Sequence, residues 1–394
     1  MDRTDDTPVY VIGAGPAGLA TAAALRARGV RAVVLERSGA VGSSWRGHYD
    51  RLHLHTPRAL SGLPGLAIPR RFGRWVSRDN MVRYLEKYAA YHDLDIVTGV
   101  EVTRIEKAEK AEKAENAEAA GDGWLLHATG GRRLAARTVV VATGYSHTPR
   151  IPDWPGLDGY TGKLLHAREY REPSPYRDLD VLVVGVGNTG AEIAVDLARG
   201  GAARVRLAVR TPPHILRRST LGWPSQRTGI LVRRLPVPLV DRAAALLTRV
   251  AVPDLAPYGL PRPETGLYTR VRQGASPVQD MGLIAAVRSG AVRPVAAVTA
   301  FDGESVVLAD GGSVAPDVVI AATGYRRGLE GMLGHLEVLD PGGRPLARGG
   351  RSPKGAPGLH FTGYTNPISG MLREIALDAD RIAREVARAR RRSG

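Results

Sequence analysis

The chain has 394 residues, of which 43% are hydrophobic, and it carries a formal net charge of +16 and no cysteine. This length predicts two domains, and the missing cysteines exclude disulfides, thiolate metal sites and cysteine-based redox chemistry. The positive charge comes mostly from arginines scattered along the whole chain, without a zinc finger, helix-turn-helix or aromatic RNA-binding motif, so we expect no nucleic-acid partner.

The N-terminal residues are polar and acidic, which is not typical of a signal peptide. No apolar run approaches the roughly 18 residues that a membrane-spanning helix needs. We therefore expect a cytoplasmic protein without a membrane span.

The first predicted unit begins with a short apolar strand at residues 9–12, followed by the turn GAGPAG and a helix from Leu19 to about Arg28. A second strand, RAVVLE, ends at Glu36. In such a βαβ unit the three glycines allow a tight turn, approach to a pyrophosphate and close helix–strand packing, and the terminal acid binds a ribose hydroxyl. We expect a dinucleotide site at Gly13, Gly15, Pro16, Ala17, Gly18, Glu36 and Arg37.

The next stretch is predicted to contain a helix near residues 79–91 and strands around 95–142, ending with TVVVATGY and a proline-bearing linker. Within it, the low-complexity run EKAEKAEKAENAEAA has Glu-before-Lys pairs such as Glu106–Lys110. This spacing favours a solvated helix between two strands, without a functional role.

A second βαβ unit starts at residues 181–184, with the turn GVGNTG, the helix AEIAVDLAR and the strand RVRLAVR. Its second strand ends in Arg210 and Thr211, and an arginine at this position grips the 2′-phosphate of NADPH. Arg217 and Arg218 are further candidates for that phosphate. We expect NADPH at Gly185, Gly187, Asn188, Thr189, Gly190, Arg210 and Thr211. Because hydride passes from nicotinamide to flavin, FAD is the economical partner in the first site.

Residues 211–282 are rich in proline and are predicted to be irregular, with an apolar and basic middle at 229–252. This middle could form a substrate lid, a homodimer face or a membrane-surface contact. Pro236 and Pro238 argue against one long membrane-surface helix, so we favour the lid or the interface.

The last third of the chain repeats a strand motif of the first, because DVVIAATGY at 317–325 echoes TVVVATGY. GLHFTGY, the loop NPISG and a helix from about Met371 follow. The echo predicts that the chain leaves one domain, builds a second and returns. We therefore expect an α/β fold with two Rossmann-like domains: a discontinuous FAD domain at 1–155 and 300–394, and an inserted NADPH domain at 156–299.

These motifs together resemble the flavin-containing monooxygenase family, in particular its YUCCA-like indole-pyruvate branch, over nearly the whole chain. The resemblance includes GAGPAG, GSSWR (42–46), YDRLHLHTP (49–57), VVATGY, GVGNTGAEIA, VQDMG (278–282), VVIAATGY and GLHFTGYT. It implies that NADPH reduces FAD, that O2 adds to give a C4a-(hydro)peroxyflavin, and that one oxygen atom enters a small 2-oxo acid, amine or thioether. Such chemistry explains why no Ser-His-Asp order, metal-ligand spacing or obvious acid–base pair is present.

The resemblance also implies roles for individual residues. Tyr160, Gly162 and His166 match the family's aromatic-x-Gly-x-x-x-His fingerprint, and His166 either couples NADPH to the flavin or is structural. Tyr170 stands where Baeyer–Villiger enzymes have tryptophan, which disfavours that alternative with ketone substrates. His55 matches an asparagine beside the flavin in animal members. The remaining expected cofactor contacts are Trp45, Arg46, Thr56, Val102, Thr143, Gly144, Thr323, Gly324, Gly363 and Tyr364. A non-oxygenating NADPH:acceptor reductase stays open, whereas a disulfide reductase is excluded by the missing cysteines.

Overall fold

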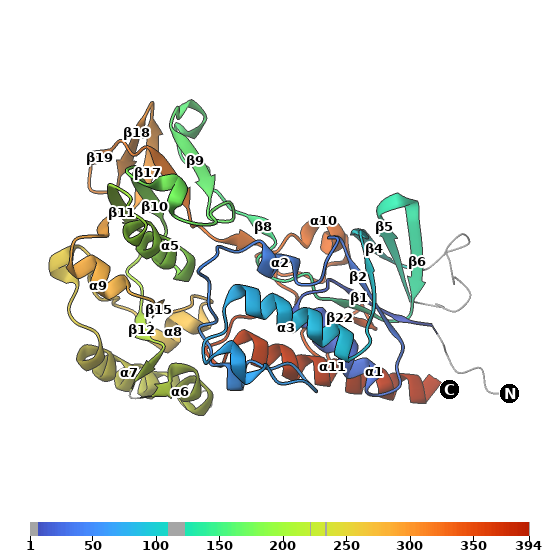
Figure 1. Cartoon of the computed structure of the whole chain (residues 1–394). Helices are drawn as coiled ribbons and strands as arrows, with labels where there is room; N and C mark the ends of the chain where they lie inside the picture. Colours follow the sequence, from blue (N-terminus) through green and yellow to red (C-terminus); the bar gives the residue numbers. More distant parts are fainter. Residues whose placement is uncertain (1–6, 109–122, 221, 233–234, 394) are drawn as a thin grey trace.

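Two five-stranded parallel sheets form the frame of the molecule in the computed structural model, which describes residues 7–108, 123–220, 222–232 and 235–393 (Figure 1). The first sheet has the strand order β22-β7-β1-β2-β3 and the second has the order β16-β11-β10-β20-β9. The bounds are Val9–Ile12 (β1), Ala32–Glu36 (β2), Asp95–Thr98 (β3), Val139–Val141 (β7), Leu359–Phe361 (β22), Lys163–His166 (β9), Asp180–Val184 (β10), Arg204–Val209 (β11), Arg293–Ala296 (β16) and Val318–Ala321 (β20).

The first sheet buries both of its faces, because alternate side chains of β1 enter different cores. Val9 and Val11 pack in a cluster with helices α1 (Pro16–Arg26), α3 (Arg78–Tyr91) and α11 (Met371–Ser393). Tyr10 and Ile12 pack toward an antiparallel sheet of β4 (Val102–Lys107), β5 (Trp124–Ala128) and β6 (Arg132–Ala136) and toward α10 (Glu330–Leu333). Helices α1 and α11 run side by side (Figure 1).

The second sheet is covered by helices on one face and by short strands on the other. Its helix-side core includes residues of α5 (Asn188–Arg199) and α9 (Leu283–Arg288). On the opposite face Leu182 and Val184 pack with Phe301 and Val306 of an antiparallel sheet. That sheet consists of β17 (Val298–Asp302), β18 (Ser305–Leu308) and β19 (Ser313–Val314).

The pairing of β20 changes one expectation about domain organisation. β20 pairs in parallel with both β10 and β9, so residues 318–321 belong to the second sheet. These residues were expected in the returning part of the first domain, from residue 300 onward. Sequence similarity could not distinguish the two sheets, because each has a buried strand that is directly followed by ATGY.

Two antiparallel chain segments connect the sheet units. β8 (Thr148–Pro149) leads away from the first sheet, β21 (Tyr325–Arg326) leads back, and the two pair with each other. The chain then contributes β22 to the first sheet, beside β7. After the second sheet the chain therefore returns to the first one.

The segment at 211–282 is more regular than expected. It contains β12 (Ile215–Arg217), β13 (Ser219–Thr220), β14 (Trp223–Pro224), α6 (Ser225–Val232), α7 (Val237–Ala251), α8 (Leu267–Arg272) and β15 (Val278–Asp280). Pro236 caps α7 and Pro238 lies in its first turn, where no helical hydrogen bond is lost, so the prolines start this helix and do not break it.

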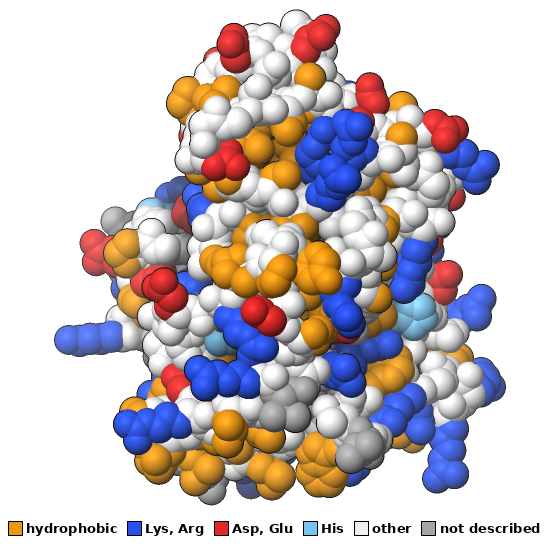
Figure 2. Space-filling view, turned by 90° about the vertical axis from the view of Figure 1, so that its left-hand side faces the viewer, with side chains coloured by type: hydrophobic (Ala, Val, Ile, Leu, Met, Phe, Trp, Pro, Cys, Tyr) orange, Lys and Arg blue, Asp and Glu red, His pale blue; other side chains and the backbone are white. Residues whose placement is uncertain are grey.

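The exposed face of α7 is apolar. Leu239, Leu246 and Leu247 are each at least 60% exposed. Figure 2 shows apolar side chains gathered at the lower edge of the molecule, where α6 and α7 lie. None of the helices in the described part of the chain is long and apolar enough to cross a membrane. The lid or interface role of this segment stays a prediction.

The remaining elements are short. They are the helix α2 (Ser43–Arg46) and the 3-10 helices η1 (Arg58–Leu60), η2 (Arg70–Phe72), η3 (Thr129–Gly131), η4 (Leu157–Gly159), η5 (Ser174–Tyr176), η6 (Ala256–Tyr258) and η7 (Gly334–Leu336). Glu106, the first residue of the low-complexity run, lies in strand β4 and not in a helix. Residues 109–122 of the predicted helical excursion, including Lys110, lie outside the described residues.

Candidate functional site

One cavity of about 600 Å³ is lined by both glycine-rich turns. From the first turn, Gly13, Gly15, Pro16 and Ala17 line it, and from the second turn Gly187, Asn188 and Thr189 do so. Both turns follow the carboxyl end of a central parallel strand, which is where ligands bind in open α/β sheets. The volume is in the range of small-molecule sites.

In the first glycine turn the outer two glycines allow close packing, and the middle glycine leaves space at the cavity. Gly13 has φ +105, and a Cβ there would lie 2.8 Å from the carbonyl oxygen of Ala142. A Cβ on Gly18 would lie 1.8 Å from the Gly13 oxygen, so only glycine allows α1 to lie this close to β1. Gly15 has no atom within 4 Å of such a Cβ, and it borders the cavity. The free space is therefore at the middle glycine.

The second turn repeats this geometry almost atom for atom. Gly185 has φ +107 and its Cβ would lie 2.7 Å from the Ala322 oxygen, while a Cβ on Gly190 would lie 1.9 Å from the Gly185 oxygen. Gly187 again has nothing within 4 Å and borders the cavity. Each turn thus leaves room for a ligand group at a helix N-terminus, where backbone N–H groups favour an anion.

Glu36 lies at the cavity with its carboxylate already partly used. It is 5% exposed, and its Oε2 accepts a hydrogen bond from the Ala14 backbone N–H at 2.7 Å. Its Oε1 accepts from the Ser38 backbone N–H at 2.9 Å. These bonds hold the carboxylate at the end of β2, and a carboxylate can accept further bonds from a ligand hydroxyl.

The arginines expected near the second site lie off the cavity lining. Arg210 and Thr211 follow β11 directly and are exposed. Arg217 is also exposed, whereas the guanidinium of Arg218 lies 4.5 Å from the centre of the Trp75 ring. Burial lowers the pKa of Arg218. An exposed arginine at the carboxyl end of a parallel strand suits the 2′-phosphate of a dinucleotide.

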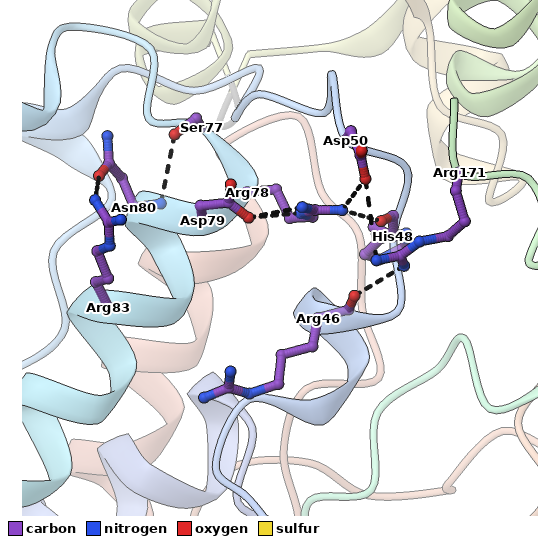
Figure 3. A network of polar contacts seen from close by, with 9 residues as sticks. All are labelled: Arg46, His48, Asp50, Ser77, Arg78, Asp79, Asn80, Arg83 and Arg171. Carbon is purple, nitrogen blue, oxygen red and sulfur yellow. Dashed lines mark hydrogen bonds and ion pairs between the residues drawn. The ribbon is translucent and has the colours of Figure 1, made fainter. Parts of the chain in front are cut away.

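Trp45 and Arg46 are both expected to contact the flavin, but their side chains lie in different surroundings. Trp45 lines the cavity and Arg46 does not. The Arg46 guanidinium binds Glu86 and the Val41 carbonyl. The backbone carbonyl of Arg46 accepts a hydrogen bond from Arg171 at 2.8 Å (Figure 3). Arg46 therefore helps to attach helix α2 to its surroundings.

The polar network in Figure 3 fixes the loop after α2. Arg78 at the start of α3 binds the Asp50 carboxylate at 2.5 Å and the His48 carbonyl at 2.8 Å. His48 itself lines the cavity, and burial together with the nearby charges of Arg171 and Arg78 lowers its pKa. The network positions the loop that carries His55 and Thr56.

His55 and Thr56, which the resemblance places at the flavin, both line the cavity. The Nε2 atom of His55 lies 2.5 Å from Oε1 of Glu192 on α5. Thr56 Oγ1 lies 2.7 Å from Ser61 Oγ. The structure thus ties this loop of the first unit to the helix of the second glycine turn.

His166 lines the cavity, but both of its ring nitrogens bind the protein itself. Its Nδ1 accepts from the Arg168 backbone N–H at 3.1 Å, so Nε2 carries the hydrogen that it donates to the Gly324 carbonyl at 3.0 Å. Burial lowers its pKa, so the ring favours the neutral form. This geometry favours a positioning role for His166, which holds the Gly324 segment at the cavity.

The other fingerprint residues pack away from the cavity. A Cβ on Gly162 would lie 2.4 Å from the Tyr160 hydroxyl oxygen, and the Tyr160 ring packs against Phe301. Tyr170 is fully buried, and its hydroxyl donates to Asp196 Oδ2 at 2.8 Å. The fingerprint therefore contributes mainly to packing beside the second sheet.

Tyr364, in the loop after β22, contacts Thr143, in the loop after β7. Its hydroxyl lies 2.8 Å from Thr143 Oγ1 and accepts from the Thr143 N–H at 3.2 Å, so it supports a cavity residue without lining the cavity. Thr323 donates from Oγ1 to the Arg150 carbonyl and is likewise off the cavity. The expected residues of this group that do line it are Val102, Thr143, Gly144, Gly324 and Gly363.

Sequence reasoning missed two buried acids on α5. Glu192 and Asp196 are each 7% exposed and lie one helical turn apart. It also missed Gln226 and Gln279, which line the cavity and have side-chain oxygens without a hydrogen-bond partner in the described part of the chain. The signal for the acids was their i,i+4 spacing on a helix whose neighbouring residues are apolar.

Comparison with known proteins agrees with this fold. The family model for pyridine nucleotide-disulphide oxidoreductases matches residues 10–221. Indole-3-pyruvate monooxygenase YUCCA1 of Oryza sativa subsp. japonica is 36% identical over 380 residues, covering 95% of this chain and 90% of that protein. Probable indole-3-pyruvate monooxygenase YUCCA3 of Arabidopsis thaliana is 33% identical, covering 96% of this chain and 86% of that protein.

Solved structures share the fold. A flavin-containing monooxygenase from Stenotrophomonas maltophilia has a TM-score of 0.70 at 23% identity, with 98% of each chain covered. Cyclohexanone monooxygenase with bound epsilon-caprolactone has a TM-score of 0.74 at 19% identity, covering 98% of this chain and 88% of that one.

The matched family model and the two parallel sheets define the class of the protein, which is an oxidoreductase. Within this class, the chain belongs to the flavin-containing monooxygenase family, in the branch of the YUCCA indole-3-pyruvate monooxygenases. The resemblance that the sequence motifs indicated is confirmed.

Proposed function

We propose that the protein uses FAD and NADPH to insert one oxygen atom of O2 into a small organic substrate. The observation that carries this proposal is the cavity that both glycine turns line, because hydride transfer requires the two cofactors to meet in one space. FAD supplies the oxygen-activating chemistry when it is bound. The surrounding residues bind and orient the ligands and exclude water.

The first sheet unit fits FAD. Gly15 leaves space at the N-terminus of α1, and the buried Glu36 stands at the end of β2 for a ribose hydroxyl. Trp45 and Gly363 also line the same cavity. We propose that this unit is a discontinuous Rossmann-like FAD domain, to which β22 and α11 return the chain.

The second sheet unit fits NADPH. Gly187 leaves equivalent space at the N-terminus of α5, and no acid stands at the end of β11, where Arg210 and Thr211 follow. An arginine there favours a 2′-phosphate over a free hydroxyl. We propose that this unit is an inserted Rossmann-like NADPH domain.

The substrate side of the cavity is supplied by the segment at 211–282. Leu216, Gln226, Val271 and Gln279 come from four of its elements and line the cavity. Two of these side chains are apolar and two carry amides, a combination that suits a small substrate with both apolar and polar groups. Among the expected classes we favour a 2-oxo acid, because the relatives are indole-3-pyruvate monooxygenases.

The test is product formation coupled to NADPH consumption. Purified protein would be assayed with isotope-labelled O2 across 2-oxo acids, amines, thioethers and ketones, with NADPH and NADH in parallel. We expect labelled oxygen in the product of one class, in near-equal amount to NADPH consumed. An ester from a ketone would replace this proposal by the Baeyer–Villiger alternative. NADPH oxidation without any oxygenated product would favour the reductase.

A further inference from the structure

A buried carboxylate on α5 holds the histidine that borders the cavity. Glu192 is 7% exposed and does not line the cavity itself. Its Oε1 lies 2.5 Å from His55 Nε2, and its Oε2 accepts a bond from the Tyr49 hydroxyl at 3.1 Å. Both partners come from the loop of the first unit, so Glu192 acts across the boundary between the two sheet units.

These contacts determine the tautomer of His55. A carboxylate only accepts hydrogen bonds, so the 2.5 Å contact requires a hydrogen on Nε2. Neutral His55 then has its lone pair on Nδ1, which has no hydrogen-bond partner within the described residues. A histidine whose one ring nitrogen is held by a carboxylate has the other oriented for a ligand.

Tyr49 stabilises the same arrangement. Burial, and then the charge of Glu192, raise the pKa of Tyr49, so its hydroxyl keeps its proton and donates to Oε2. Burial lowers the pKa of His48 and of Arg218, and the charge of Glu192 partly opposes that lowering at both residues. With both oxygens of Glu192 engaged, the His55 ring has little freedom to flip.

The neighbouring acid provides a comparison. Asp196, one turn later on α5, binds the Tyr170 hydroxyl at 2.8 Å and Arg51 at 3.2 Å. None of these three residues lines the cavity. Asp196 therefore joins the two units without reaching a cavity residue, whereas Glu192 reaches the cavity through His55.

We propose that Glu192 is a positioning residue that holds His55 in the Nε2–H tautomer, so that Nδ1 accepts a hydrogen bond from an N–H or O–H group of the ligand in the cavity. This inference rests on the proposed function for the identity of that ligand, which is the bound cofactor or the substrate. The assignment of the tautomer itself is independent of any turnover.

The first experiment reads the tautomer directly. The holoprotein, labelled with nitrogen-15 in its histidines, would be studied by two-bond proton–nitrogen spectra, with the His55→Gln variant to assign the signal. We expect His55 to carry its hydrogen on Nε2 in the wild type and to populate both tautomers in Glu192→Gln, because an amide can accept or donate. A wild-type hydrogen on Nδ1 would overturn the proposal, even if Glu192→Gln did not fold.

The second experiment tests whether Glu192 acts through His55. Glu192→Gln is expected to lower the yield of product per NADPH about tenfold, the lower end of the range found when a partner that orients a histidine is removed. In the His55→Gln background the same change is expected to have no further effect. Asp196→Asn is the matched control, and its effect is expected to be independent of His55. Additive effects of Glu192→Gln and His55→Gln would overturn the proposal.

The two proposals fail in different ways. If no substrate gives an oxygenated product with the wild type, the proposed function fails while the spectra still decide the tautomer. If the wild type forms product but the tautomer is unchanged in Glu192→Gln, only the positioning role fails.

Discussion

The two kinds of glycine in the second turn are predicted to respond differently to the same substitution. A Cβ on Gly190 would lie 1.9 Å from the Gly185 oxygen, well inside the 3.0 Å that real Cβ contacts reach, so α5 would have to shift by about 1 Å. A Cβ on Gly187 meets nothing within 4 Å, and its φ of −75 suits alanine. Gly190→Ala therefore changes the fold, and Gly187→Ala changes the space for a ligand.

The magnitudes follow from packing. Overpacking of this kind costs roughly 1–3 kcal/mol, partly offset by about 1 kcal/mol that alanine gains over glycine within a helix. The net cost of up to about 2 kcal/mol, at roughly 2–4 °C per kcal/mol, is expected to lower the Tm of Gly190→Ala by up to about 8 °C. Gly187→Ala is expected to leave the Tm of the protein without NADPH unchanged while raising the Kd for NADPH about tenfold or more, because the methyl group occupies the place of the pyrophosphate.

The assay is thermal unfolding followed by circular dichroism, together with NADPH titration under anaerobic conditions. Flavin content, read from absorbance, should be unchanged in Gly187→Ala, since that residue belongs to the other turn. The reasoning is refuted if Gly187→Ala lowers Tm as much as Gly190→Ala does, or if it binds NADPH as tightly as the wild type.

Three further changes test other parts of the structure. Arg210→Ala is expected to raise KM for NADPH by about tenfold to 100-fold and to leave KM for NADH unchanged, because only the 2′-phosphate is lost as a partner; equal effects on both would contradict a role at that phosphate. Tyr170→Phe should reduce the free energy of unfolding by about 2 kcal/mol in urea titrations, because Asp196 loses a buried donor, and an unchanged value would show that Arg51 compensates fully. Burial lowers the pKa of His360 to about 4, below roughly 6.5 in an unfolded chain, so the unfolded state binds the proton first and the contribution of His360 to stability is lost as pH falls from about 6.5 toward 4. Between pH 7 and pH 5 this amounts to about 2 kcal/mol, and His360→Leu should show a smaller loss in urea unfolding over that range; an identical loss would assign the pH dependence to other groups.

The positions of the glycine turns could be read from the sequence because their causes are local. Gly13 and Gly18 are five residues apart, and a Cβ on Gly18 is forbidden by the Gly13 oxygen of the same turn. The same reasoning located the second turn at Gly185 and Gly190. Strand β1, helix α1 and strand β2 follow from apolar periodicity within that unit.

Local motifs did not show to which sheet β20 belongs, nor where the side chain of Arg46 points. Both strands that lead into ATGY are buried and apolar, and only pairing with β10 shows to which sheet the second one belongs. Arg46 lies next to Trp45 in the chain, but Glu86 on α3 draws its guanidinium away from the cavity. Adjacent residues on a short helix face different directions, so a shared motif did not give them a shared environment.

Local motifs in short segments of the chain were enough to predict the family and the two glycine turns. Most of the residues that these motifs predicted for the site also line the cavity. How the histidines are used depends instead on contacts between distant segments. His55 meets Glu192 across 137 residues, and His166 meets the Gly324 carbonyl across 158. A histidine's tautomer depends on the partners of both ring nitrogens, and only the tertiary structure supplies these partners. Glu192 reaches His55 across the two sheet units, whereas Gly324 follows β20, which pairs with the strand that carries His166.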